Sequence, residues 1–259
     1  MNSQEALDRP IRIAIVGAGP AGFYAADRLL RDERDFEVEL FDRLATPFGL
    51  VRAGVAPDHP KIKAVTRVYE KTAARDGFRF HGNVEIGSDL THSELMDTHD
   101  AVIYTYGASQ DRKLGIPGED LEGSVAATSF VAWYNGHPDA AHREFDLSGK
   151  RAVVVGNGNV AVDVARMLML PREEHVVTDI ADHALEALAS SSIEEVVILG
   201  RRGPAQAAYT TPELRELGEL TAADVVVDPA EIELDAASRA WLDSDDADRT
   251  ARDNVGMVT

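Results

Sequence analysis

Two glycine-rich segments, each preceded by an apolar run, constrain this chain more than any other feature. The first is IAIVGAGPAG at residues 13–22, and the second is AVVVGNGNVAVDVA at residues 152–165. Glycines at this spacing permit a tight turn between a strand and a helix, and the first amides of such a helix can hold phosphates. One motif of this kind arises easily by chance, but two in the same context predict two nucleotide sites in one chain.

The first segment has the sequence context of a Rossmann unit. Residues 13–16 are all apolar and predict a buried strand, and apolar residues recur at helical spacing after the glycines. Between these elements, Gly17 would permit the turn, Gly19 would let a pyrophosphate approach the backbone, and Gly22 would let the helix pack on the strand. The alternative is a glycine turn that serves packing alone.

The residues that end the next strand differ between the two units. In the first unit a strand over residues 36–41 ends at Asp42, where a Rossmann unit carries the acid that binds a ribose. In the second unit, a strand over residues 196–199 is followed by Arg201 and Arg202. An acid repels a 2′-phosphate, whereas paired guanidiniums bind it through charge-assisted hydrogen bonds. We therefore expect an unphosphorylated ribose at the first site and NADP at the second, unless the arginines are only a solvated loop.

Composition limits the classes of protein to consider. The 259 residues, 44% of them hydrophobic, suffice for one large or two ordinary domains. Cysteine is absent, which excludes thiol relays and cysteine-ligated clusters and leaves flavin and nicotinamide as redox groups. The net charge of −19 argues against a nucleic-acid partner. Without a long apolar stretch or an apolar signal region, the sequence predicts a cytoplasmic protein that does not contact a membrane.

The charges are unevenly distributed. A continuous helix would align four basic residues that recur every four positions; they are Lys63, Arg67, Lys71 and Arg75. This basic stripe would either dock an acidic protein partner or be an ordinary solvated helix face. Residues 219–253 are acid-rich, with few large apolar residues after Trp241, and predict a solvated helix or a frayed end.

Several longer motifs have no generic structural explanation. They are TPFGLVRAGVAPDHPKIK at residues 46–63, then FVAWYNGHP, VVGNGNVAVDVAR and ILGRRGPAQAAYTTPELREL. In these motifs and their spacing the chain resembles adrenodoxin reductase and the FprA-type NADPH:ferredoxin reductases over nearly its whole length. The resemblance implies a flavoprotein that accepts hydride from NADPH on FAD and passes single electrons to a ferredoxin, an acidic iron–sulfur protein. Flavin suits this exchange because it can hold one electron or two.

The resemblance also implies which residues form the sites. The FAD site would comprise the first glycine turn, a ribose acid and two apolar contacts, namely Gly17, Ala18, Gly19, Ala21, Gly22, Asp42, Leu50 and Val84. The NADP site would comprise the second turn, the arginine pair and two further polar residues, namely Asn157, Gly158, Asn159, Val160, Arg201, Arg202, Arg112 and Glu213. No metal site is predicted.

Two polar residues are the candidate catalytic groups. His59 and Glu213 match residues that approach the flavin and the nicotinamide in the family that the chain resembles. A histidine there could hold or relay a proton. The alternative for His59 is a loop histidine fixed between Pro57 and Pro60.

Together these features predict an α/β fold with two Rossmann-like, three-layer βαβ nucleotide-binding domains. We place an FAD-binding domain at residues 1–112 and an NADP-binding domain at residues 113–259. In the family the FAD domain is discontinuous and is completed by a C-terminal segment, so we expect this chain to be truncated. Two alternatives remain open: an electron-feeding module similar to the small subunit of glutamate synthase, and a truncated, non-catalytic nucleotide-binding protein. Thioredoxin reductase is excluded because it needs a C-x-x-C pair.

Overall fold

The computed structural model describes residues 9–108 and 110–258, and their backbone contacts form two compact units. Unit 1 ends at Val55, resumes at His59 and runs to Lys113. Unit 2 consists of Ala56–Asp58 and the chain from Leu114 onward. Sequence reasoning had assigned Ala56–Asp58 to the first domain, because nothing local distinguishes these three residues from their neighbours.

Unit 1 is built on a four-stranded parallel sheet of order β3-β2-β1-β4. Its strands are β1 (Ile11–Val16), β2 (Phe36–Phe41), β3 (Phe78–His81) and β4 (Ala101–Tyr104). Its helices are α1 (Pro20–Leu30), α2 (Leu50–Ala53), α3 (Pro60–Lys63), α4 (Thr66–Ala73) and α5 (His92–Thr98). Parallel neighbours require crossover connections, and the helices provide them.

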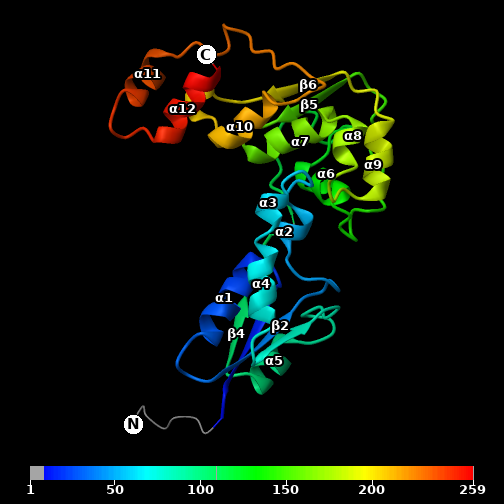
Figure 1. The fold of residues 1–259 in the computed structure, drawn as a ribbon, viewed down its shortest axis with the longest axis vertical. Helices are drawn as coiled ribbons and strands as arrows, with labels where there is room; N and C mark the ends of the chain where they lie inside the picture. The colour runs from blue at the N-terminus through cyan, green and yellow to red at the C-terminus, as the bar shows by residue number, and fades with distance from the viewer. Residues whose placement is uncertain (1–8, 109, 259) are drawn as a thin grey trace. The chain divides into compact units, whose positions relative to one another are not determined.

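Helices cover both faces of this sheet (Figure 1). On one face Ile15 and Leu40 pack with Phe23 of α1 and Tyr69 of α4. On the other face Val16 and Phe41 pack with Leu95 of α5. Successive side chains of a strand point to opposite faces, so continuous apolar runs fit a sheet buried on both sides. The prediction of an α/β fold with parallel strands is confirmed.

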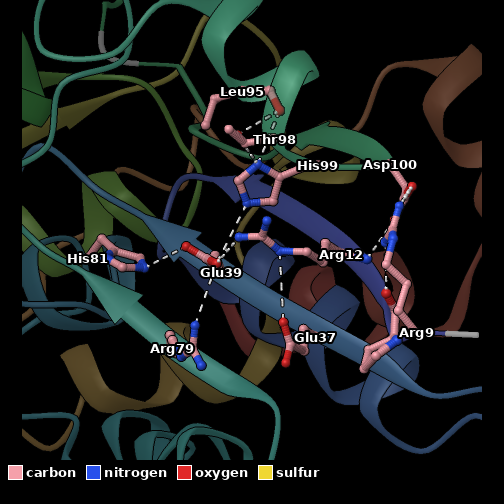
Figure 2. A network of polar contacts seen from close by, with 11 residues as sticks. Arg9, Arg12, Glu37, Glu39, Arg79, His81, Leu95, Thr98, His99 and Asp100 are labelled. Carbon is pink, nitrogen blue, oxygen red and sulfur yellow. Dashed lines mark hydrogen bonds and ion pairs between the residues drawn. The ribbon is translucent and has the colours of Figure 1, made fainter.

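A charged cluster lies on the sheet face that carries Phe41 (Figure 2). The Glu39 carboxylate accepts a hydrogen bond from Nη2 of Arg12 at 2.9 Å. Oε2 of Glu39 lies 2.9 Å from Nε2 of His81. Oε1, which accepts the bond from Arg12, lies 3.9 Å from Nε2 of His99. The His81 ring stacks on Phe41, with centroids 4.8 Å apart. Three strands and the segment after α5 are thus joined around one carboxylate.

Unit 2 has a two-stranded parallel sheet, formed by β5 (Arg151–Val155) and β6 (Glu195–Leu199). Its α-helices are α6 (Ala127–Tyr134), α7 (Asn159–Met169), α8 (Arg172–His175), α9 (Asp182–Ala189), α10 (Thr211–Leu217), α11 (Ala236–Leu242) and α12 (Arg249–Val258), with a short 3₁₀ helix, η1 (Pro204–Gln206). The main core joins α6, α7 and α9 and is rich in aromatic residues such as Phe130 and Trp133. Among the described residues, no helix is both long and apolar enough to cross a lipid bilayer.

Two local predictions changed in the structure. Residues 219–235 of the acid-rich region form no helix or strand. Its later part is not frayed, because α12 packs against η1 and α10 and a small core forms around Leu242 and Ala251. The basic stripe is wrong as a single helix, because α3 ends at Lys63 and α4 spans only Thr66–Ala73. Backbone hydrogen bonds between residues three apart link the two helices. Arg75 lies beyond α4, with its Nε 3.4 Å from Oδ1 of Asp27.

Candidate functional sites

The first glycine turn joins β1 to α1, and packing accounts for two of its glycines. Gly17 has φ +109°, and a Cβ there would lie 2.5 Å from the backbone of Tyr106. A Cβ on Gly22 would lie 2.2 Å from the carbonyl oxygen of Gly17. At Gly19 the nearest atom would be 4.0 Å away, the Cα of Gly49. Gly17 and Gly22 are therefore required by the fold, whereas a side chain at Gly19 would meet no close contact.

Asp42, at the end of β2, holds the backbone of this turn. Its Oδ2 accepts the Ala18 amide at 2.8 Å, and its Oδ1 accepts the Leu44 amide at 2.9 Å. Sequence reasoning assigned Asp42 to a ribose. In the structure each of its carboxylate oxygens already has a main-chain donor, although a carboxylate can accept further hydrogen bonds.

Thr105, directly after β4, holds the same turn from another strand. Its hydroxyl donates to the carbonyl oxygens of Gly17 at 2.8 Å and of Val16 at 3.1 Å. Sequence reasoning missed Thr105. The available signal was its position: β4 neighbours β1, so the residue after β4 reaches the carboxyl edge beside the glycine turn.

The turn leaves main-chain donors for an anion. Within residues 9–108, neither the Gly19 amide nor the Gly22 amide donates a hydrogen bond to a protein acceptor. These amides lie at the start of the 11-residue helix α1, where the helix dipole is positive. The arrangement fits a pyrophosphate.

The other predicted residues of unit 1 have differing surroundings. Leu50 is 71% exposed at the start of α2. Val84 is half-buried against the core that contains Phe41, and its amide donates to the Asp42 carbonyl. His59 is buried, and its carbonyl oxygen accepts two amides of α3. Arg112 is exposed in the segment after β4.

The second glycine turn joins β5 to α7 and is tied to a later segment. Gly156 has φ +135°. The carbonyl oxygen of Asn157 accepts the amides of Ala208 and Tyr209, and Oδ1 of Asn159 accepts the Thr210 amide at 2.7 Å. Gly158 precedes α7, and Val160 lies half exposed in its first turn. The turn and the start of α10 are therefore held together.

The backbone directly before the arginine pair lies against this turn. Gly200 follows β6, and a Cβ on it would lie 2.8 Å from Nδ2 of Asn157. Arg201 and Arg202 come next in the chain and are exposed. The chain that carries the arginine pair therefore leaves β6 beside the second glycine turn.

Glu213 of α10 belongs to a buried charge cluster around Arg166, which sequence reasoning missed. The Arg166 side chain is 4% exposed. It pairs with Asp58 at 2.6 Å, Asp163 at 2.9 Å and Glu216 at 3.0 Å, and its Nη1 lies 3.7 Å from Glu213. Burial alone lowers the pKa of Arg166, but Asp58 and the other carboxylates outweigh it and raise that pKa. The available signal was a charged residue among the apolar residues of α7.

Comparison with known proteins agrees with this geometry. Residues 11–198 match the pyridine nucleotide-disulphide oxidoreductase family. The chain belongs to this family. The family is named for disulphide chemistry, but these 259 residues contain no cysteine, so they supply no thiol.

Within this family, the chain is most informatively compared with two named reductases. The chain is 54% identical to NADPH-ferredoxin reductase FprA of Mycobacterium leprae over 251 residues, which cover 95% of this chain and 54% of the relative. It is 50% identical to the mitochondrial NADPH:adrenodoxin oxidoreductase of Arabidopsis thaliana, covering 91% of this chain and 50% of the relative. The resemblance inferred from the sequence motifs is confirmed.

The solved structures give the same result. The structure of Mycobacterium tuberculosis FprA in complex with NADPH matches with a TM-score of 0.90 at 52% identity. The match covers 96% of this chain and 55% of that one. The chain thus spans about half the length of the family members that it matches.

Proposed function

We propose that the protein is an FAD-dependent NADPH:ferredoxin oxidoreductase, with FAD bound by unit 1 and NADP bound by unit 2. The observation that carries the proposal is the presence of two strand–turn–helix sites, one in each unit. They occur in a chain 54% identical to a relative named NADPH-ferredoxin reductase. That name supports NADPH as the electron donor and a ferredoxin-type protein as the acceptor.

In unit 1 the Gly19 and Gly22 amides would hold the pyrophosphate of FAD. The two amides without a protein acceptor, at the start of α1, support this placement. Leu50 is an exposed apolar side chain that would gain from contact with an aromatic ring system. When bound, FAD would accept two electrons as hydride from NADPH and release them singly, as an iron–sulfur acceptor requires.

In unit 2 the turn formed by Asn157, Gly158, Asn159 and Val160 would hold the pyrophosphate of NADP. Arg201 and Arg202 would bind its 2′-phosphate. Their position directly after β6, where the backbone approaches Asn157, supports this role. The proposal predicts a preference for NADPH over NADH.

His59 and Glu213 are proposed as the polar groups at the reacting ends of the two cofactors. The Glu213 carboxylate lies 3.7 Å from the buried guanidinium of Arg166, which limits the positions it can adopt. It would make a polar contact with the nicotinamide. The His59 imidazole would hold or release a proton beside the flavin.

The acceptor would dock partly through basic residues of α4. Arg67 and Lys71 are exposed on this helix, four residues apart. They are what remains of the stripe expected from sequence. Their charge complements an acidic iron–sulfur protein, so replacing both with glutamate should slow ferredoxin reduction most at low ionic strength.

The first test is a visible absorbance spectrum of the purified chain after incubation with FAD and removal of the excess. Retained flavin bands that bleach under anaerobic NADPH are the expected result. Failure to retain flavin would contradict the FAD site in this chain. Retained flavin that NADPH does not bleach would instead support the non-catalytic alternative.

A further inference from the structure

The first glycine turn is held from outside at successive peptide units. The Gly17 amide donates to the carbonyl oxygen of Phe41 at 2.8 Å. The next peptide unit, between Gly17 and Ala18, is bonded at both of its ends to side chains. The carbonyl oxygen of Ala18 then accepts the Phe48 amide at 2.7 Å. Three different segments of unit 1 therefore act on this short stretch of backbone.

The peptide unit between Gly17 and Ala18 is fixed most firmly. Its carbonyl oxygen accepts the Thr105 hydroxyl, and its N–H donates to the Asp42 carboxylate, both at 2.8 Å. The carbonyl and the N–H of a trans peptide point in opposite directions. The hydrogen bonds to Thr105 and Asp42, at opposite ends of the peptide unit, therefore fix the orientation of its plane. Without them, the flexible backbone of Gly17 would allow the plane to rotate.

Phe48 fixes the next peptide unit, between Ala18 and Gly19, and its own backbone is strained. Because its amide binds the Ala18 carbonyl oxygen, the N–H of Gly19 in the same unit must point away from Phe48. Phe48 has φ +92°, which is uncommon for a residue with a side chain. Its ring packs against Phe23 and Tyr69, with centroids 5.3 and 5.8 Å away. This packing helps to hold Phe48 in the strained conformation.

We propose that Asp42, Thr105 and Phe48 are positioning residues that orient the first glycine turn so that the Gly19 amide faces the diphosphate of the bound dinucleotide. The inference rests on the proposed function, because it concerns how the FAD site is prepared. It gives Asp42 a role that does not depend on the ribose. Thr105 and Asp42 act on the same peptide unit, so removing either contact loosens the same plane.

The test compares two ligands that differ only in the ribose hydroxyls. ADP and 2′,3′-dideoxy-ADP would each compete with FAD for the wild-type chain and for two isosteric variants, Thr105→Val and Asp42→Asn. Thr105→Val leaves the charge unchanged, while Asp42→Asn turns one amide acceptor into a donor. If these residues act through the turn, each variant weakens both ligands by a similar factor, about tenfold.

Matched controls exist within unit 1. Thr98→Val removes a hydroxyl that also donates to backbone carbonyls, those of Glu94 and Leu95 in α5. Asp89→Asn changes an aspartate whose Oδ2 also accepts a backbone amide, that of Glu85, at 2.8 Å. Neither contacts the glycine turn, and both should bind the two ligands as the wild type does.

Failure of the positioning role and failure of the FAD site give different results. If Asp42→Asn weakens ADP but not the dideoxy ligand, Asp42 acts through the ribose and the inference is overturned. If the wild type binds neither FAD nor ADP, the FAD site itself fails. In that case amide hydrogen exchange of the ligand-free chain still reports on the turn, because the Ala18 amide is hydrogen-bonded. Faster exchange at Ala18 in both variants supports the positioning role, and unchanged exchange contradicts it.

Discussion

The guanidinium of Arg166 donates two hydrogen bonds to the carboxylate of Asp58, which lies 108 residues away in the chain. The distances are 2.6 Å from Nε and 3.0 Å from Nη2, and the two side chains are 4% and 18% exposed. Arg166 also contacts carboxylates of α7 and α10. It is therefore the buried cation around which three separate segments of unit 2 assemble.

Arg166→Met should destabilise unit 2 strongly. The substitution leaves several partly buried carboxylates without this cation, and breaking a buried pair from one side costs about 3–5 kcal/mol. The matched control is Arg172→Met, which removes an exposed pair with Glu186 and should cost less than about 1 kcal/mol. Urea unfolding of both variants provides the comparison. Equal losses would contradict a central role for Arg166.

The cluster around Glu39 should make unit 1 sensitive to acid. Burial raises the pKa of Glu39, but the hydrogen bond from Arg12 and the nearby imidazoles of His81 and His99 outweigh it, so the pKa is lowered overall. A carboxylate with a lowered pKa in the folded state stabilises the protein above its unfolded pKa of about 4.3. This contribution is lost as the pH falls below that value and through the folded pKa.

Glu39→Gln is the direct test of this pH dependence. The variant should lose stability on the order of 1 kcal/mol near neutral pH, because the charge-assisted bond to Arg12 is weakened. The difference from the wild type should then shrink as the pH is lowered. Glu37→Gln, which removes a 3.8 Å contact to the same arginine, is the control. A gap between Glu39→Gln and the wild type that stays constant with pH would rule out this contribution.

The sequence correctly predicted features that depend on a single short segment. Residues 36–41 were predicted as a strand, and β2 has the same bounds. Gly22 was expected to allow close packing of α1, and a Cβ there would meet Gly17 and approach Leu40. These features depend on apolar runs and on glycine sterics, which a single segment of sequence reveals.

Contacts between distant segments could not be predicted in the same way. The Thr105 hydroxyl reaches Gly17 only because β4 and β1 are neighbours, and Arg166 meets Asp58 only in the folded unit. The basic stripe failed for a related reason. Four-residue spacing cannot reveal that the helix is interrupted after Lys63, where Val65 packs into the core of unit 1.

Gly22→Ala should disrupt the first glycine turn, because its methyl group would lie 2.2 Å from the Gly17 carbonyl oxygen. The backbone must shift, so we expect a loss of about 2 kcal/mol or more of stability together with weakened FAD binding. The control is Gly256→Ala in α12, where no atom lies within 4 Å. That change should stabilise its helix by about 0.5–1 kcal/mol. Thermal melts with and without FAD distinguish the two effects.

Asn254 should anchor helix α12, which begins at the end of the acid-rich region. It is almost fully buried, its Oδ1 accepts the Thr211 hydroxyl at 2.8 Å, and its Nδ2 donates to the Tyr209 carbonyl oxygen at 2.8 Å. Asn254→Ala leaves both partners unsatisfied and should cost about 2–3 kcal/mol. Limited proteolysis should then cleave within α12 sooner than in Asp253→Ala, a more exposed neighbour. Equal cleavage of the two variants would show that α12 is held by other contacts.

The last prediction concerns the choice of nicotinamide coenzyme. If Arg201 and Arg202 bind a 2′-phosphate, replacing both with glutamine should weaken NADPH binding by about 10- to 100-fold, because charge-assisted hydrogen bonds are lost. NADH lacks the phosphate and should be nearly unaffected. Arg172→Gln combined with Arg249→Gln removes the same charge from exposed sites of unit 2 and controls for the general electrostatic effect. Titration of both coenzymes gives the ratio. An equal loss for NADPH and NADH would mean that the arginine pair supports the second turn without recognising the phosphate.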